Sequence, residues 1–420
     1  MKNVINQNWN RKPLMCGLTT LFSLISLSAC LSSPNGGQKI LASDGAPDDF
    51  FGFSVAISGD TALVGALSDD DDLSGPDAGS AYVFTRSGYG WKQQAKLTAF
   101  DGSPNDTFGG NVALFGDTAV IGASRRDDKG EDSGSAYVFV RSGTTWAYQA
   151  KIMASDGAQG DAFGQSVTLL GDTLVVGAPR DDDKGEDSGS AYVFTRTGST
   201  WSQQAKLTAA DGAAGDVFGI SVAKSGDTIL VGADLNDEID NNAGAAYVYT
   251  RSGNSWTQQA KLTASDGGEI DIFGVRVALS GDTALISARR DDTVKGVDAG
   301  SAYVFTRIGT SWSQQAKLTA PDGDADDRFG RSVALAGDTA VIGAMFQDDK
   351  GDNSGSAYMF TRSGNIWSQK DKLIAIDGVP DDRFGWSAAL SGETVIIAAT
   401  GVDDNGDGSG AAYIYDIARE

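Results

Sequence analysis

A unit of 55 to 57 residues recurs seven times along this chain, and the recurrence restricts the possible folds more than any other feature of the sequence. Each copy begins with a Phe-Gly pair. Three further landmarks follow in phase: Gly-Asp-Thr (as at Gly171), Ala-Tyr (as at Ala191) and Trp-x-x-Gln (as at Trp201). A fixed period of this length indicates a repeat architecture, in which each copy folds as one supersecondary unit. The seven pairs are Phe51-Gly52, Phe108-Gly109, Phe163-Gly164, Phe218-Gly219, Phe273-Gly274, Phe329-Gly330 and Phe384-Gly385.

Each copy contains four short segments with the two-residue alternation of β-strands. In the third copy these segments are Phe163–Leu170, Thr173–Ala178, Ser190–Arg196 and Trp201–Ala209. The first two are separated only by Gly171-Asp172, a dipeptide that is typical of a tight hairpin turn. No segment beyond the N-terminal region has a helical period, so the sequence predicts an all-β fold.

Four antiparallel strands repeated seven times predict a seven-bladed β-propeller. The alternative is a two-sheet sandwich, but a single sandwich rarely contains so many strands. Gln38–Asp44 matches the fourth-strand pattern without a copy before it, whereas the last copy, Phe384–Ile417, supplies only three strands. We therefore expect the N-terminal strand to complete the last blade and close the ring, which removes two open sheet edges. The predicted propeller covers residues 38–420.

Residues 1–29 have the pattern of a secretory signal peptide. A basic start precedes the apolar stretch Leu14–Leu27, which is short for a membrane span, and small residues follow it. The end of this segment, Leu27-Ser28-Ala29-Cys30, resembles the lipobox of bacterial lipoproteins, in which the cysteine is lipidated. The alternative is ordinary cleavage near Ala29 with Cys30 incidental. Lipidation would place the chain in the cell envelope, on either side of an outer membrane, with residues 30–37 as a short tether.

The chain carries 56 acidic residues, 33 basic residues and no histidine, which gives a formal net charge of −23. Most acids lie in two kinds of loop: the blade-to-blade loops, which precede each first strand, and the second-to-third loops, which join the second and third strands. In a four-stranded blade both kinds lie at the same end, so we expect one strongly acidic end that attracts cations. A recurring arginine, Arg196 in the third copy, leaves the opposite end close to neutral. So acidic a chain is not expected to bind nucleic acid.

The repeats resemble the FG-GAP repeats of integrin α-subunit propellers and their bacterial relatives. The resemblance rests on the seven Phe-Gly pairs and on a following Gly-Ala in five copies. Gly-Ala-Pro is complete only at Gly177-Ala178-Pro179, and the fifth and seventh copies have Ser287-Ala288-Arg289 and Ala398-Ala399-Thr400 instead. The resemblance implies a seven-bladed propeller that often binds calcium and contacts other macromolecules at cell surfaces. The Gly-Ala pairs begin at Gly65, Gly122, Gly177, Gly232 and Gly343.

Calcium binding is an expectation with a departure from the integrin pattern. In integrin repeats the Asp-rich calcium loop lies between Phe-Gly and Gly-Ala-Pro, where this chain has only the Gly-Asp-Thr turn. Calcium needs about six to eight oxygen ligands, which short Asp-rich loops can supply. The alternative is that these aspartates form turns and add solubilising charge. The candidate ligands in the two kinds of loop are Asp127, Asp128, Asp132, Asp156, Asp161, Asp182, Asp183, Asp187, Asp211, Asp216, Asp403, Asn405 and Asp407.

A tryptophan opens the fourth strand in six copies. These side chains either form carbohydrate platforms between blades or cover a neighbouring blade face, and packing is the commoner role. Trp386 lies outside this phase, directly after Phe384-Gly385, and the sequence offers no explanation for it. The six residues in phase are Trp91, Trp146, Trp201, Trp256, Trp312 and Trp367.

Catalysis needs one asymmetric set of unlike groups, whereas these copies are nearly identical and contain no histidine. We therefore expect a protein that is not an enzyme. The favoured function is a lipid-anchored binding or adhesion module of the cell envelope, whose acidic loops contact a protein or glycan. One alternative is a scaffold propeller without a dedicated ligand. The other is a carbohydrate-active enzyme, because paired carboxylates are present in every copy.

Overall fold

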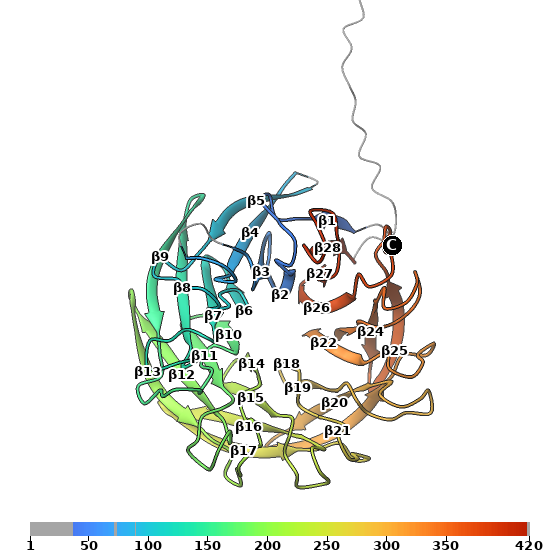
Figure 1. Cartoon of the computed structure of the whole chain (residues 1–420). Helices are drawn as coiled ribbons and strands as arrows, with labels where there is room; N and C mark the ends of the chain where they lie inside the picture. The colour runs from blue at the N-terminus through green and yellow to red at the C-terminus, as the bar shows by residue number, and fades with distance from the viewer. Residues whose placement is uncertain (1–36, 71–73, 89, 418–420) are drawn as a thin grey trace, which may run out of the picture. The chain divides into compact units, whose positions relative to one another are not determined.

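The computed structural model describes residues 37–70, 74–88 and 90–417, so the signal peptide and the lipidation predicted at Cys30 lie outside the described residues. The described strands form seven sheets of four antiparallel strands, and these sheets are the blades of a ring (Figure 1). The structure thus confirms the all-β seven-bladed propeller and rules out the sandwich. Within the described residues, no helix has the length and apolar character that a membrane crossing needs.

In each blade the first strand lies nearest the centre of the ring and the fourth at the periphery (Figure 1). The first strands are β2 (Phe51–Ser58), β6 (Asn111–Phe115), β10 (Ser166–Leu170), β14 (Ser221–Ser225), β18 (Val277–Ser280), β22 (Phe329–Ala336) and β26 (Phe384–Ser391). The second strands are β3 (Thr61–Ala66), β7 (Thr118–Ala123), β11 (Thr173–Ala178), β15 (Thr228–Ala233), β19 (Thr283–Ala288), β23 (Thr339–Ala344) and β27 (Thr394–Ala399). The third strands are β4 (Ser80–Ser87), β8 (Ser135–Ser142), β12 (Ser190–Thr197), β16 (Ala245–Ser252), β20 (Ser301–Ile308), β24 (Ser356–Ser363) and β28 (Ala411–Asp416). The fourth strands are β5 (Gly90–Leu97), β9 (Thr145–Ile152), β13 (Thr200–Leu207), β17 (Ser255–Leu262), β21 (Ser311–Leu318), β25 (Ile366–Leu373) and β1 (Gln38–Ile40).

The hairpin turn predicted between the first two strands is present. In the third blade β10 and β11 pair as far as Leu170 and Thr173, and Gly171 between them has a φ of 61°, which glycine adopts without strain. β11 has the predicted bounds, but β10 begins three residues later than predicted. Gly164, with a φ of 96°, interrupts the pairing, and the ladder starts at Ser166 opposite Gly177. In β2 the same interruption is a bulge between Phe51 and Ser54, so that strand keeps its predicted start.

The hydrophobic core consists of seven clusters, each formed by two neighbouring blades. Between the second and third blades, the fully buried ring of Phe163 lies edge-on to Tyr192 at 5.5 Å and to Phe194 at 6.0 Å, between ring centroids. Aromatic pairs in this geometry stabilise a core beyond the area that they bury. Since every cluster takes residues from two blades, the blades stabilise one another.

At five blade interfaces the backbone of the Phe-Gly pair packs directly on the Gly-Ala segment of the preceding blade. A Cβ added at Gly177 would lie only 2.0 Å from the carbonyl oxygen of Gly219 in the next blade. Glycine therefore permits a backbone contact that any side chain would prevent. In the fifth and seventh copies, Ser287 and Ala398 take this position, and their Cβ atoms fill the space beside the facing glycine.

The N-terminal strand β1 is the outer strand of the last sheet, in the order β1-β28-β27-β26. It pairs antiparallel with β28, from Gln38 opposite Ile414 to Ile40 opposite Ala412. The side chain of Gln38 also exchanges two hydrogen bonds with the first blade: its Nε2 donates to the carbonyl oxygen of Trp91 at 2.9 Å, and the amide of Trp91 donates to its Oε1 at 2.7 Å. The strand therefore joins the two ends of the chain.

Deleting Lys39–Ser43 is expected to lower the cooperative melting temperature sharply, because β28 loses its outer partner and the first blade loses a neighbour. Calorimetry of the full-length protein measures this change. The control is Gln38→Ala, which removes only the two bonds to Trp91 and should cost much less, on the order of 1 kcal/mol per hydrogen bond. A deletion that melts like the wild type would contradict a stabilising role for β1.

Candidate functional site

A lysine in the fourth strand of every blade joins the two kinds of acidic loop. In the third blade, Nζ of Lys206 lies 2.9 Å from a carboxylate oxygen of Asp156 in the blade-to-blade loop. It also lies 2.9 Å from Asp181 and 2.6 Å from Asp183, both in the second-to-third loop. We call each such group a lysine cluster. The other six clusters are centred on Lys39, Lys96, Lys151, Lys261, Lys317 and Lys372, each with at least two carboxylates.

The strand register places each lysine. Lys206 lies directly opposite Tyr192 in the ladder between β12 and β13, so both side chains extend from the same face of the sheet. The ammonium group lies 5.2 Å from the centroid of the tyrosine ring, and the tyrosine hydroxyl donates to Asp181 at 2.7 Å. Because one ammonium contacts both kinds of loop in each blade, the two loops lie at the same end, as the sequence predicts.

The lysine clusters hold one carboxylate of each blade-to-blade loop in its ionised form. Burial by itself would raise the pKa of Asp156, but the hydrogen bond and charge of Lys206, together with hydrogen bonds from the backbone and Tyr192, outweigh burial and lower the pKa below its ordinary value. The pKa is lowered in the same way in the other six blades, at Asp44, Asp101, Asp211, Asp266, Asp322 and Asp377.

A second carboxylate in the same loop has the opposite shift. Asp161 is only 4% exposed, and its Oδ2 accepts a hydrogen bond from the amide of Ala158 at 2.8 Å. Burial raises the pKa of Asp161 to about 6, although this hydrogen bond opposes the rise. In the fourth blade, Asp216 accepts from the amide of Ala213 at 2.9 Å, and burial raises its pKa as well. Each of these buried aspartates accepts a hydrogen bond from an amide of its own loop and so stabilises the conformation of that loop.

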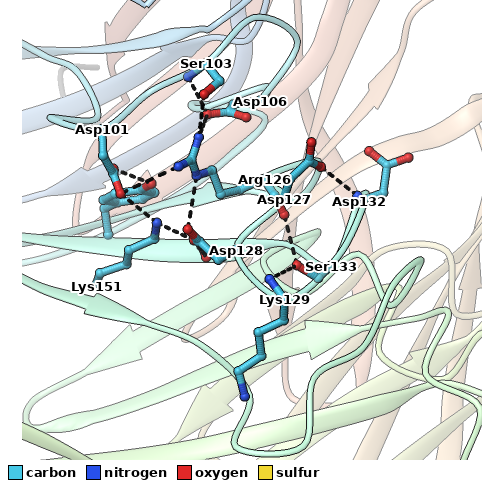
Figure 2. Close-up of polar contacts among 12 residues, drawn as sticks. Asp101, Ser103, Asp106, Arg126, Asp127, Asp128, Lys129, Asp132, Ser133 and Lys151 are labelled. Atoms are coloured by element: carbon cyan, nitrogen blue, oxygen red, sulfur yellow. Dashed lines mark hydrogen bonds and ion pairs between the residues drawn. The ribbon is translucent and has the colours of Figure 1, made fainter.

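The aspartates at the start of the second-to-third loops also bond their own backbone. Each accepts a hydrogen bond at 2.9 Å from an amide five residues later: Asp127 from Asp132, Asp182 from Asp187 and Asp403 from Gly408. Figure 2 shows this bond in the second blade, beside the cluster of Lys151 with Asp101 and Asp128. Further bonds close the seventh loop, where the amide of Asn405 donates to Ser409 and the carbonyl oxygen of Asp407 accepts from Asp48.

The candidate calcium ligands thus make two different kinds of contact. Asp128, Asp156, Asp183 and Asp211 pair with lysines, whereas Asp161 and Asp216 accept from loop amides. In the part of the chain that the structure describes, no three Asp, Glu, His or Cys side chains are placed to hold a metal ion. These positions fit the turn-forming alternative, since the ammonium group already occupies the point where loop carboxylates meet. Calcium binding stays a prediction.

The sequence interpretation missed the lysines. Strand alternation assigns Lys206 to the solvent side, and its partners lie 50 and 25 residues away along the chain. One signal was available: a lysine recurs in phase in all seven fourth strands, and in six of them it follows the tyrosine that it faces at a fixed spacing, whereas Lys39 faces Tyr413 across the ring closure.

At the other end of the blades, the tryptophans take part in packing. In the third blade, Trp201 packs on the core cluster, and its Nε1 donates to Gln149 of the preceding blade at 3.0 Å. The guanidinium group of Arg196 lies over the indole, 5.1 Å from the ring centroid, and Nε of Arg196 lies 2.7 Å from Asp172 of the hairpin turn. These contacts support the packing role, and they agree with the near-neutral charge predicted for this end.

Comparison with known proteins gives one family. A family model described as FG-GAP repeat matches seven segments, which together cover most of the chain. No curated protein matches. The matched segments are residues 36–84, 91–139, 146–194, 201–249, 256–305, 312–360 and 367–415.

We expect the protein to be more stable near pH 5 than at pH 7 and to lose stability below about pH 4. The pKa values of Asp49, Asp161, Asp271 and Asp327 are raised to about 6, so the folded state binds protons more tightly than the unfolded chain between pH 6 and the ordinary value of 3.8. The carboxylates with lowered pKa values contribute stability that is lost below that range. Melting temperatures across this range test the prediction, and Asp161→Asn should reduce the gain on acidification. A melting temperature that falls steadily from pH 7 to pH 4 would contradict it.

Lys206→Met is expected to destabilise the protein by roughly 1–3 kcal/mol, because three carboxylates lose their shared cation and Asp181 is buried. Urea unfolding measures the loss. Lys184→Met is the matched control, since Lys184 is exposed in the adjoining loop and should be neutral on substitution. Equal stabilities of the two variants would show that the cluster does not stabilise the blade.

Proposed function

Because the chain belongs to the FG-GAP repeat family, whose model matches all seven copies, we propose that the protein is a binding module of the cell envelope. Its acidic loops contact a protein or glycan partner. A lipid on Cys30 provides its only attachment to the membrane, and nucleic acid is not a partner.

The observation that carries this proposal is the repetition of one loop geometry with exposed carboxylates. In the third blade, Asp182 and Glu186 are exposed, while Asp182 and Lys206 hold the loop in place through their own contacts. Asp127 and Glu131 are exposed at the matching positions of the second blade. A loop that is ordered before binding loses little entropy when a partner binds.

The repeated loops favour a partner with several cationic groups, because linked weak contacts multiply affinity. A basic protein segment or an amine-bearing glycan has this chemistry. We assign the chain no catalytic role, since every blade has a lysine cluster and catalysis depends on one distinguished set of groups. The alternative is a scaffold whose acidity serves only solubility.

Full-length protein applied to a glycan array and to surface-coupled oligolysine is expected to bind at least one of them, and the binding should weaken as ionic strength rises. The double variant Asp127→Asn with Asp182→Asn should bind more weakly, because asparagine keeps an acceptor oxygen for the capped amide but loses the charge. Glu393→Gln is the control, since Glu393 is exposed in a hairpin turn at the opposite end.

Absence of binding to every glycan and to oligolysine would leave the scaffold alternative in place. The same measurements in calcium and then in chelator test the metal prediction. Binding or melting that changes between the two conditions would support a calcium site in the loops, and unchanged values would contradict it.

A further inference from the structure

The inner strands of blades five to seven depart from the repeat. The residue directly after Phe-Gly is uncharged in six copies, where it is Phe53, Gly110, Gln165, Ile220, Val275 or Trp386. In the sixth copy it is Arg331, which lies in β22 and is only 6% exposed. A charged side chain is rarely buried without a partner, so this exception requires an explanation.

Arg331 lies among other cationic groups. Its guanidinium carbon is 4.0 Å from the centroid of the Trp386 indole, and within the described residues its buried Nε has no hydrogen-bond partner. The charges that act on it are those of Arg276, just before β18, and Arg289, just after β19. Nε of Arg289 and Nε1 of Trp386 are likewise buried without a partner among the described residues. Arg331 thus contacts Trp386 directly, and the charges of Arg276 and Arg289 act on it from the neighbouring blade. One nitrogen of the Arg276 guanidinium already donates to the carbonyl oxygen of Val275 at 2.9 Å. The strands that carry or adjoin these residues include β18, β22 and β26, which lie near the centre of the ring (Figure 1).

The three arginines have too few carboxylates nearby to balance their positive charge. Asp234, just after β15, acts on Arg276 and Arg289, but no carboxylate of the described residues forms an ion pair with Arg276, Arg289 or Arg331. Burial lowers the pKa of Arg331, and burial together with Arg276 lowers the pKa of Arg289 to about 10, which is still far above neutral pH. The guanidinium group of arginine keeps its charge in proteins, and a buried charge without a counterion is costly.

We propose that an oxyanion (phosphate, sulfate or carboxylate) binds between blades five, six and seven, where Arg331, Arg276 and Arg289 supply guanidinium donors and Trp386 supplies its indole N–H. Planar guanidinium groups match the geometry of these anions and bind them through paired hydrogen bonds. The inference does not depend on the proposed function, since it concerns arginines within or next to the inner strands and not the exposed carboxylates of the loops. It also explains Trp386, which lies outside the phase of the other tryptophans: its ring stacks on Arg331, and its N–H remains available to a ligand.

The test is a calorimetric titration of the full-length protein with inorganic phosphate, sulfate and acetate in separate experiments, at constant ionic strength and at low millimolar concentration. We expect saturable binding of at least one anion and a matching rise in melting temperature. The three arms distinguish a phosphate-type ligand from a sulfate or a carboxylate. Arg331→Met keeps much of the apolar stem and removes the charge, so its affinity should fall about tenfold or more.

Arg180→Met is the matched control, because Arg180 is exposed and should keep the wild-type affinity. In anion-free buffer, Arg331→Met should melt no lower than the wild type, since replacing an unpaired buried charge by an apolar group relieves its desolvation. If Arg331→Met fails to fold, Arg289→Met replaces it, with the same loss of affinity expected. Failure of the wild type to bind any of the three anions would overturn the inference. Equal affinity of the wild type and the folded variant would also overturn it.

Discussion

The close approach of two glycine backbones at five of the seven blade interfaces is the contact on which the rest of the ring depends. The Phe-Gly of one blade lies so near the Gly-Ala of the preceding blade that a Cβ at Gly177 would meet Gly219 at 2.0 Å. This approach seats the phenylalanine against the tyrosine and phenylalanine of the third strand, at the interface between blades. Since each of the seven core clusters is shared by two blades, the spacing set by the glycines sets the packing of the whole domain.

The two ends of the blades manage charge in different ways. One end of the blades carries the hairpin turns between the first and second strands. There, an arginine such as Arg196 lies over a tryptophan and pairs with Asp172 of the turn. At the loop end, a single ammonium group binds carboxylates from two loops, while other aspartates in those loops hydrogen-bond the backbone. The net charge of −23 thus coexists with local pairing in every blade. The carboxylates left exposed lie on ordered loops, as a contact surface requires.

Residues that the seven copies share specify the fold, whereas residues that differ between copies indicate a specific site. Ser287, Arg289, Arg331 and Trp386 all belong to blades five to seven. Ser287 replaces a glycine that five copies share, and Arg289 and Arg331 are the only basic residues at their positions. Small side chains at two of the seven interface positions are compatible with the ring, as Ser287 and Ala398 show. The buried arginine with an unpartnered Nε has no such structural explanation, and local rules are most often broken at functional sites.

The sequence alone determined the architecture, because strand alternation, turn dipeptides and a fixed period are local signals that repeat seven times. The unmatched fourth-strand pattern at Gln38–Asp44 also pointed to its place beside β28. Tertiary structure decided what the polar side chains do. Lys206 appears solvent-facing in its strand, yet its carboxylate partners come from loops 50 and 25 residues earlier, and Arg331 meets Trp386 across a blade interface. A local pattern specifies which face of a strand a residue occupies, whereas the partner that it meets there depends on how neighbouring blades and loops are placed.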